Sequence, residues 1–118
     1  MIDLVEEQQR IKDLIEAKGL SVVEIEKRAT EQSGIYLKST GIKVKNIWNI
    51  FFWNIEIIEP SLAKHNSVLN TVSAILTALQ EDRARLSQNQ IADIDKASSV
   101  NIKNGFKFTI NFTSTKRI

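Results

Sequence analysis

The chain has 118 residues, of which 42% are hydrophobic and 25% are charged, and its formal net charge is +2. This composition is typical of one ordinary globular domain and not of a disordered chain. The absence of cysteine excludes disulfides, thiolate metal sites and a cysteine nucleophile, and the four glycines match no phosphate-binding fingerprint. We therefore predict no catalytic residue, no metal and no cofactor, and hence no enzyme.

The sequence contains no stretch of the length and apolarity that a membrane span requires. The most apolar stretch, residues 47–58, has about twelve residues, whereas a spanning helix needs roughly 20. Residues 1–7 lack the cationic start and the apolar centre of a signal peptide. We expect a cytoplasmic protein with no membrane partner.

Charge is distributed unevenly along the chain. Residues 34–54 carry three lysines and no acid, and residues 96–118 carry five basic residues and no acid. The acidic segments, residues 1–33 and 55–95, each have a net charge of −3. Two acid-free basic segments can form one positive surface for phosphates if folding brings them together, or they can be chance clusters in a near-neutral chain.

The N-terminal residues predict two helices. Asp3 is a candidate N-cap for a helix over residues 4–18, and Gly19 suits the left-handed position that ends such a helix. A capping box that begins at Ser21 predicts a second helix over residues 22–32. In both segments the apolar residues recur at the spacing of one helix face.

Residues 42–58 are dense in isoleucine, tryptophan and phenylalanine, and two interpretations stay open. The apolar spacing fits a helix, whereas the β-branched and aromatic content suits a strand. The length of the segment and the spacing of its asparagines favour the helix. Pro60 marks the boundary that follows it.

The second half of the chain predicts one long and one short helix. The long helix begins at Ser61 or Asn66 and carries a regular apolar stripe as far as Leu79. Ser87 opens another capping box, which predicts a short helix that ends at about Ala97.

The last residues predict a β-hairpin. Apolar and polar side chains alternate on both sides of Asn104 and Gly105, and these two residue types tolerate the positive φ of a type I′ turn. A two-stranded hairpin is marginal alone, so its aromatic face must pack on the helices or on another copy. The residues expected on that face are Phe106, Phe108, Ile110 and Phe112.

Together these elements predict a mainly α fold. We expect a compact bundle of four to five short helices, with a helix-turn-helix-like N-terminal part and a C-terminal β-hairpin. The helical domain would span residues 1–98, and the hairpin with its basic tail would span residues 99–118.

Residues 10–29 resemble the first two helices of the Cro/repressor-like (XRE-type) helix-turn-helix family, in which a first helix ends in Lys-Gly-Leu-Ser and a second follows. The Glu-Pro-Ser-Leu stretch at residues 59–62 is similar to the stretch before that family's later core helix, so the resemblance covers residues 10–80. The segment over residues 30–42 is longer than the family's turn. The expected recognition helix, residues 43–53, is unusually aromatic, which is typical of a degenerate member.

The resemblance implies a DNA-binding transcriptional regulator that binds duplex DNA as a homodimer. In such a protein, lysines neutralise phosphates, hydroxyls bind phosphate oxygens and asparagine can contact adenine. The alternative is that the asparagines only form the solvated outer face of a core helix. The candidate DNA contacts are Lys38, Ser39, Thr40, Lys43, Lys45, Asn46 and Asn49. The candidate auxiliary phosphate contacts are Lys103, Lys107, Lys116 and Arg117.

The alternative function is a non-enzymatic protein-interaction module: an adaptor, an antitoxin-like inhibitor or a phage assembly component. Trp48, Phe52 and Trp53 cannot all be buried on one narrow helix face, and exposed aromatic residues more often mark protein interfaces than duplex readout. The candidate dimer or partner interface comprises Trp53, Phe106, Phe108, Ile110 and Phe112.

Overall fold

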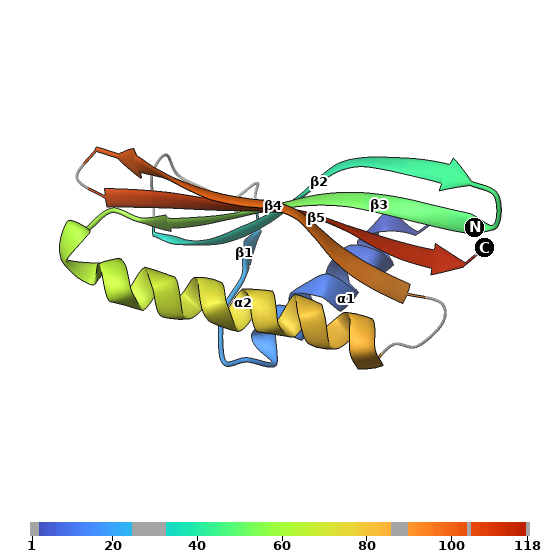
Figure 1. The fold of residues 1–118 in the computed structure, drawn as a ribbon, viewed down its shortest axis with the longest axis horizontal. Helices are drawn as coiled ribbons and strands as arrows, with labels where there is room; N and C mark the ends of the chain where they lie inside the picture. The colour runs from blue at the N-terminus through green and yellow to red at the C-terminus, as the bar shows by residue number, and fades with distance from the viewer. Residues whose placement is uncertain (1–2, 25–32, 86–89, 104, 118) are drawn as a thin grey trace.

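Two helices lie against one face of a β-sheet in the computed structural model of the chain, which describes residues 3–24, 33–85, 90–103 and 105–117 (Figure 1). The molecule is elongated, with principal extents of 46 × 27 × 22 Å. The long axis follows the strands, because each of the four long strands has 12 or 13 residues.

Helix α1 (Leu4–Glu16) confirms the first predicted helix. The Asp3 carboxylate accepts a hydrogen bond of 3.0 Å from the backbone N–H of Glu6, as an N-cap should. Gly19, just past the end of α1, has a φ of 83°, the left-handed conformation that glycine adopts at low cost.

Helix α2 (His65–Arg85) confirms the predicted long helix, and a short 3-10 turn, η2 (Leu62–Lys64), precedes it. Most of its predicted apolar stripe is buried: Ile75 and Leu79 are fully enclosed, whereas Leu69 is 44% exposed. No helix in the described ranges is long and apolar enough to cross a membrane.

The sheet has five strands in the order β1-β2-β3-β5-β4. Strand β1 (Val23–Glu24) pairs in parallel with β2 (Gly34–Lys45). The other three pairs are antiparallel: β2 pairs with β3 (Trp48–Glu59), β3 with β5 (Gly105–Arg117), and β5 with β4 (Gln90–Ile102). Two hairpins, β2–β3 and β4–β5, therefore join along β3 and β5 to make one sheet.

The core lies between the sheet and the two helices. Every second residue is buried there from Asn49 to Ile57 in β3 and from Ile110 to Ser114 in β5, which is the period-two burial of a strand with one covered face. The largest of these strand residues pack with apolar residues of α1 and α2 in one cluster. Its fully buried members are Ile11, Ile15, Phe51, Trp53, Ile55, Ile75, Leu79, Ile110 and Phe112.

The predicted mainly α bundle is wrong, because a mostly antiparallel sheet dominates the structure. The largest error concerns residues 42–58, which form the end of β2, a turn and β3. In β3 burial alternates along the run from Asn49 to Ile57, so the apolar residues follow a period of two and not of 3.6. The β-branched and aromatic content was the correct signal, and the expected recognition helix over residues 43–53 does not form.

The predictions of two shorter helices are also wrong for the residues that the structure describes. Residues 90–97 of the predicted short helix belong to β4. Of the helix predicted over residues 22–32, residues 23 and 24 form β1, and residues 25–32 lie outside the described residues. The expected domain boundary between residues 98 and 99 falls inside β4.

The C-terminal hairpin is confirmed, although the expected reason for its glycine is wrong. Ile102 pairs with Gly105, so Gly105 is the first residue of β5, and its φ is not positive. A Cβ at this position would lie 2.2 Å from the carbonyl oxygen of Glu59 and 2.6 Å from Cα of Pro60. Glycine is therefore required by the close approach of the β3–α2 connection, and not by turn geometry.

We expect Gly105→Ala to lower the free energy of unfolding by about 1–3 kcal/mol, because backbone atoms must move to admit the methyl group. Gly41→Ala is the matched control, since the nearest atom to its added Cβ is Cδ2 of Phe52 at 3.9 Å. Urea denaturation followed by circular dichroism measures both. Equal free energies of unfolding of the two variants would contradict the claim that Glu59 and Pro60 leave room only for glycine at position 105.

Candidate interaction surface

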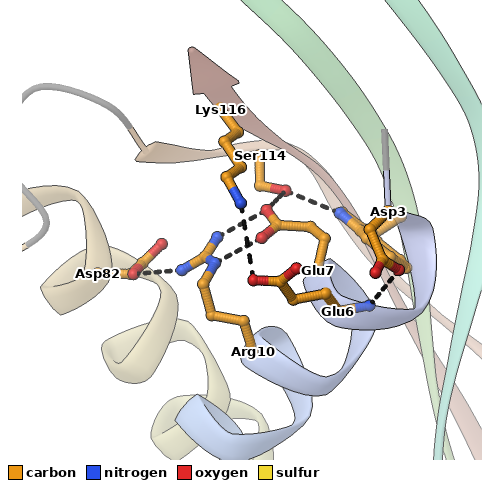
Figure 2. Close-up of polar contacts among 8 residues, drawn as sticks. Asp3, Glu6, Glu7, Arg10, Asp82, Ser114 and Lys116 are labelled. Atoms are coloured by element: carbon orange, nitrogen blue, oxygen red, sulfur yellow. Dashed lines mark hydrogen bonds and ion pairs between the residues drawn. The ribbon is translucent and has the colours of Figure 1, made fainter. Parts of the chain in front are cut away.

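A buried polar cluster joins the helices to the sheet (Figure 2). The Arg10 guanidinium donates to both carboxylate oxygens of Glu7, at 2.6 and 2.9 Å, and to Oδ1 of Asp82 at 2.8 Å. Glu7 is 3% exposed and Asp82 is fully buried. Burial lowers the pKa of Arg10, but hydrogen bonds and charges from Glu7 and Asp82 outweigh it, so this pKa stays above its ordinary value.

The same cluster continues into the sheet. The Ser114 hydroxyl donates to Oε2 of Glu7 at 2.7 Å and accepts from Nε1 of Trp53 at 2.9 Å. One chain of contacts thus runs from α2 through α1 to β5 and β3. Because Glu7, Ser114 and Trp53 are almost wholly enclosed, this cluster positions the helices and offers little access to a ligand.

The other face of the sheet, which we call the open face, points away from α1 and α2 (Figure 1). The strand residues that alternate with the helix-facing ones lie on it, and two of these, Tyr36 and Ile58, are themselves buried. On the inner strands β3 and β5 these positions are Trp48, Ile50, Phe52, Asn54, Glu56, Lys107, Thr109, Asn111, Thr113, Thr115 and Arg117. On the outer strands β2 and β4 they are Lys38, Lys43, Lys45, Asp93, Lys96, Ser98 and Val100.

Basic side chains from both acid-free segments meet on the open face. Lys45 pairs with Trp48, which pairs with Arg117, so one row across three strands carries two positive charges. Further along, Lys107 binds Glu56 at 3.2 Å. Six of the assigned positions are basic and two are acidic, so the open face has an excess of positive charge.

The end of the β2–β3 hairpin, residues 41–52, exposes apolar side chains on both of its faces. Val44 is 54% exposed, Ile47 is 48% exposed and Phe52 is 36% exposed. This hairpin end reaches one tip of the molecule (Figure 1). Its charged residues are Lys43 and Lys45 alone. Apolar side chains gathered at a projecting tip are a feature of protein interfaces.

Both edges of the sheet present strand backbone over most of their length. β1 pairs only with Tyr36 and Leu37, and within the described chain β2 has no partner strand on that side from residue 38 to residue 45. At the opposite edge, β4 pairs only with β5 among the described strands. Long exposed edges of this kind can pair with further strands.

A hollow of about 450 Å³ lies where the two edges bulge. The pairing register shifts between Ser39 and Gly41 in β2, and between Ile94 and Lys96 in β4. Bulges increase strand twist and bend the sheet, which leaves this shallow space. The hollow is lined by Thr40, Phe52, Trp53, Asp93, Ile94, Asp95, Asn111, Phe112 and Thr113.

The predicted DNA contacts divide into those that share the open face and those that lie elsewhere. Lys38, Lys43 and Lys45 share the open face with Lys107 and Arg117. The remaining ones lie elsewhere: Ser39 is opposite the buried Trp53, Thr40 lies at the bulge, Lys103 follows β4, and Lys116 approaches Glu6 at 3.8 Å.

The two asparagines have structural positions. Asn46 has a φ of 55° in the two-residue turn between β2 and β3, a conformation that asparagine tolerates better than most residues. Asn49 is only 6% exposed, on the helix side of β3. Neither lies on the outer face of a helix, so the expected helix contacts to adenine have no basis in this fold.

The predicted partner interface is largely part of the core. Trp53, Ile110 and Phe112 are at most 1% exposed, and Phe106 and Phe108 are half-buried. The shared face of the hairpin is confirmed, and it packs towards the helices. Since β5 pairs with β3 on one side and β4 on the other, it has no edge to offer a second copy.

Sequence reasoning missed the exposed apolar residues Ile42, Val44 and Ile47. Their signal was present: Ile42 and Val44 alternate with Lys43 and Lys45 immediately before an asparagine that can turn the chain. Because residues 42–58 were interpreted as a helix, this alternation was not recognised, and the hairpin end was not predicted.

No known protein family and no curated protein sequence matches the chain. The resemblance of residues 10–80 to the Cro/repressor-like family therefore stays a prediction. Within the ranges that the structure describes, no group of three or more histidine, aspartate or glutamate side chains could hold a metal ion.

We expect Arg10→Met to lower the free energy of unfolding by about 3 kcal/mol or more, because it leaves the buried carboxylates of Glu7 and Asp82 without their cation. Lys116→Met is the control, since its ion pair with Glu6 is long and exposed and should change stability by less than about 0.5 kcal/mol. Chemical denaturation of both variants measures the difference. Similar losses in the two variants would contradict a structural role for the cluster.

Proposed function

We propose that this chain is a non-enzymatic assembly subunit of the cytoplasm, which binds further copies of itself through the uncovered parts of its sheet. The observation that carries the proposal is the hairpin end, where Ile42, Val44, Ile47 and Phe52 are each more than one-third exposed. By contrast, the helix-facing residues at the centre of the sheet, such as Trp53, Ile55 and Ile110, are almost completely buried. Four of the nine large apolar side chains that are exposed in the described chain therefore lie in this one hairpin end.

Association would remove these side chains from water. Full burial of a valine, isoleucine or phenylalanine side chain contributes about 1.5–3 kcal/mol relative to full exposure. Because the hairpin side chains are already partly covered, each would contribute less than this. Several of them, together with strand hydrogen bonds at an edge, can still offset the entropy lost on association.

The two edges of the sheet favour an assembly component over an adaptor or an antitoxin-like inhibitor. An adaptor or an inhibitor needs one binding surface for each of its partners. Neither role requires that the subunit have two different unpaired strand edges. Here the two edges, residues 38–45 of β2 and the whole of β4, lie on opposite sides of the sheet. A subunit with this arrangement can be contacted by one neighbour on each side.

Sedimentation velocity over a concentration series tests this function. We expect species larger than the 13.4 kDa monomer, and we expect Val44→Glu to weaken association at least tenfold because it places a charge in the apolar contact. Leu69→Glu is the matched control: Leu69 is 44% exposed, but it lies on α2 and not in the hairpin end. A wild-type chain that stays monomeric throughout the series contradicts the proposal.

A second candidate function, binding of a nucleic acid, is favoured by the positive open face. Lys38, Lys43 and Lys45 lie beside the aromatic positions Trp48 and Phe52 on that face. Lysines can neutralise phosphates while aromatic side chains stack on unpaired bases, so the arrangement suits a single strand better than the major groove of a duplex.

This second function predicts salt-dependent binding of a short single-stranded oligonucleotide, measured by fluorescence anisotropy. Replacing both Lys43 and Lys45 by alanine should reduce the slope of log K against log salt by roughly one per lysine. Lys64→Ala serves as the control, because Lys64 is an exposed lysine of η2, just before α2. Binding whose salt slope is the same for all three proteins would show that the open face does not hold the phosphates.

A further inference from the structure

The two open edges of the sheet differ in charge. The β2 edge carries Lys38, Lys43 and Lys45 and no acid. The β4 edge carries exposed carboxylates at Asp93 and Asp95, and Lys96 follows them. The pairing register between β4 and β5 skips Asp95, so this residue lies in the bulge of the edge strand.

The directions of the strands allow the sheet to continue from one copy to the next. From β2 through β3 and β5 to β4, each strand runs opposite to its neighbour. β2 and β4 therefore run in opposite directions. A second copy set beside β4, in the same orientation, brings its β2 alongside as an antiparallel strand and keeps its helices on the same face.

Charge distinguishes this head-to-tail contact from the two symmetric ones. Pairing β2 with the β2 of a second copy would place Lys43 and Lys45 beside the same lysines, and like charges on adjacent strands are destabilising. Pairing β4 with β4 would bring the carboxylates of Asp93 and Asp95 together. Pairing β2 with β4 places lysines beside carboxylates instead.

One antiparallel register satisfies both of these charge pairs. Opposite residues in an antiparallel pair run in reverse order, so a register with Lys45 opposite Asp93 also brings Lys43 beside Asp95, the extra residue of the β4 bulge. The β4 residues that follow, from Ala97 to Ser99, have small side chains, which leave the backbone of this edge accessible to a second strand.

We propose that the β2 edge of one copy pairs with the β4 edge of the next, with Lys43 beside Asp95. This inference rests on the proposed function and names its partner: a second copy of this chain, bound head to tail. Such a contact leaves one β2 edge and one β4 edge unfilled at the ends of any pair. Further copies can therefore add, either until a ring closes or along an open filament.

The natural absence of cysteine makes cross-linking a direct test. Two single variants, Lys43→Cys and Asp95→Cys, are purified separately, mixed and mildly oxidised. Opposite residues of paired antiparallel strands have Cα atoms about 4.5–5.5 Å apart, which a disulfide can bridge. We expect a covalent dimer in the mixture and little in either variant alone, and little when Lys64→Cys replaces Lys43→Cys.

A charge-reversal series keeps the test decisive if a cysteine variant folds poorly. Lys43→Glu should weaken self-association roughly tenfold, and adding Asp95→Lys to the same chain should restore it. Lys64→Glu should leave association unchanged.

The outcomes separate the two proposals. Wild-type association with no cross-link in the mixture, and with no rescue of Lys43→Glu by Asp95→Lys, overturns the head-to-tail contact but leaves the assembly function standing. Efficient cross-linking of Lys43→Cys alone also overturns it, in favour of a symmetric β2 contact. A monomeric wild-type chain overturns both proposals.

Discussion

Two helices cover only one face of this sheet, and the surface chemistry of the molecule follows from that constraint (Figure 1). The covered face is fixed by apolar packing and by the contacts that link Asp82, Arg10, Glu7, Ser114 and Trp53. Among the described residues, the helices leave the hairpin end exposed and residues 38–45 of β2 and the outer side of β4 without a partner strand. Backbone groups and apolar side chains left in this way favour contacts with other chains.

The sequence predicted the elements whose local signals are strong and unambiguous. Both long helices carry regular apolar stripes, and α1 begins at the predicted cap, Asp3. The C-terminal hairpin follows a clear alternation. Residues 42–58 were misassigned because helical spacing and strand composition competed, and nothing local decides between them. The segment forms a strand because β3 pairs with β5, which lies about sixty residues further along the chain. The sequence of residues 42–58 by itself contains no information about this pairing.

The candidate residues show the same division. Lys38, Lys43 and Lys45 share one face with Lys107 and Arg117, although Lys107 lies opposite Ile58, ten residues along β3 from the row of Lys45 and Arg117. The aromatic residues were assigned to an interface without knowledge of their surroundings. Trp53 and Phe112 became core residues once two helices lay over them. The acidic edge of β4 could not be predicted while that segment was interpreted as a helix.

Hydrogen–deuterium exchange of the wild-type chain at low and at high protein concentration tests assembly through the sheet edges most directly. We predict that amides of residues 38–45 and of β4 exchange more slowly as concentration rises, while the inner strands β3 and β5 are unchanged. Exchange in both edge strands that is independent of concentration would contradict edge-mediated assembly.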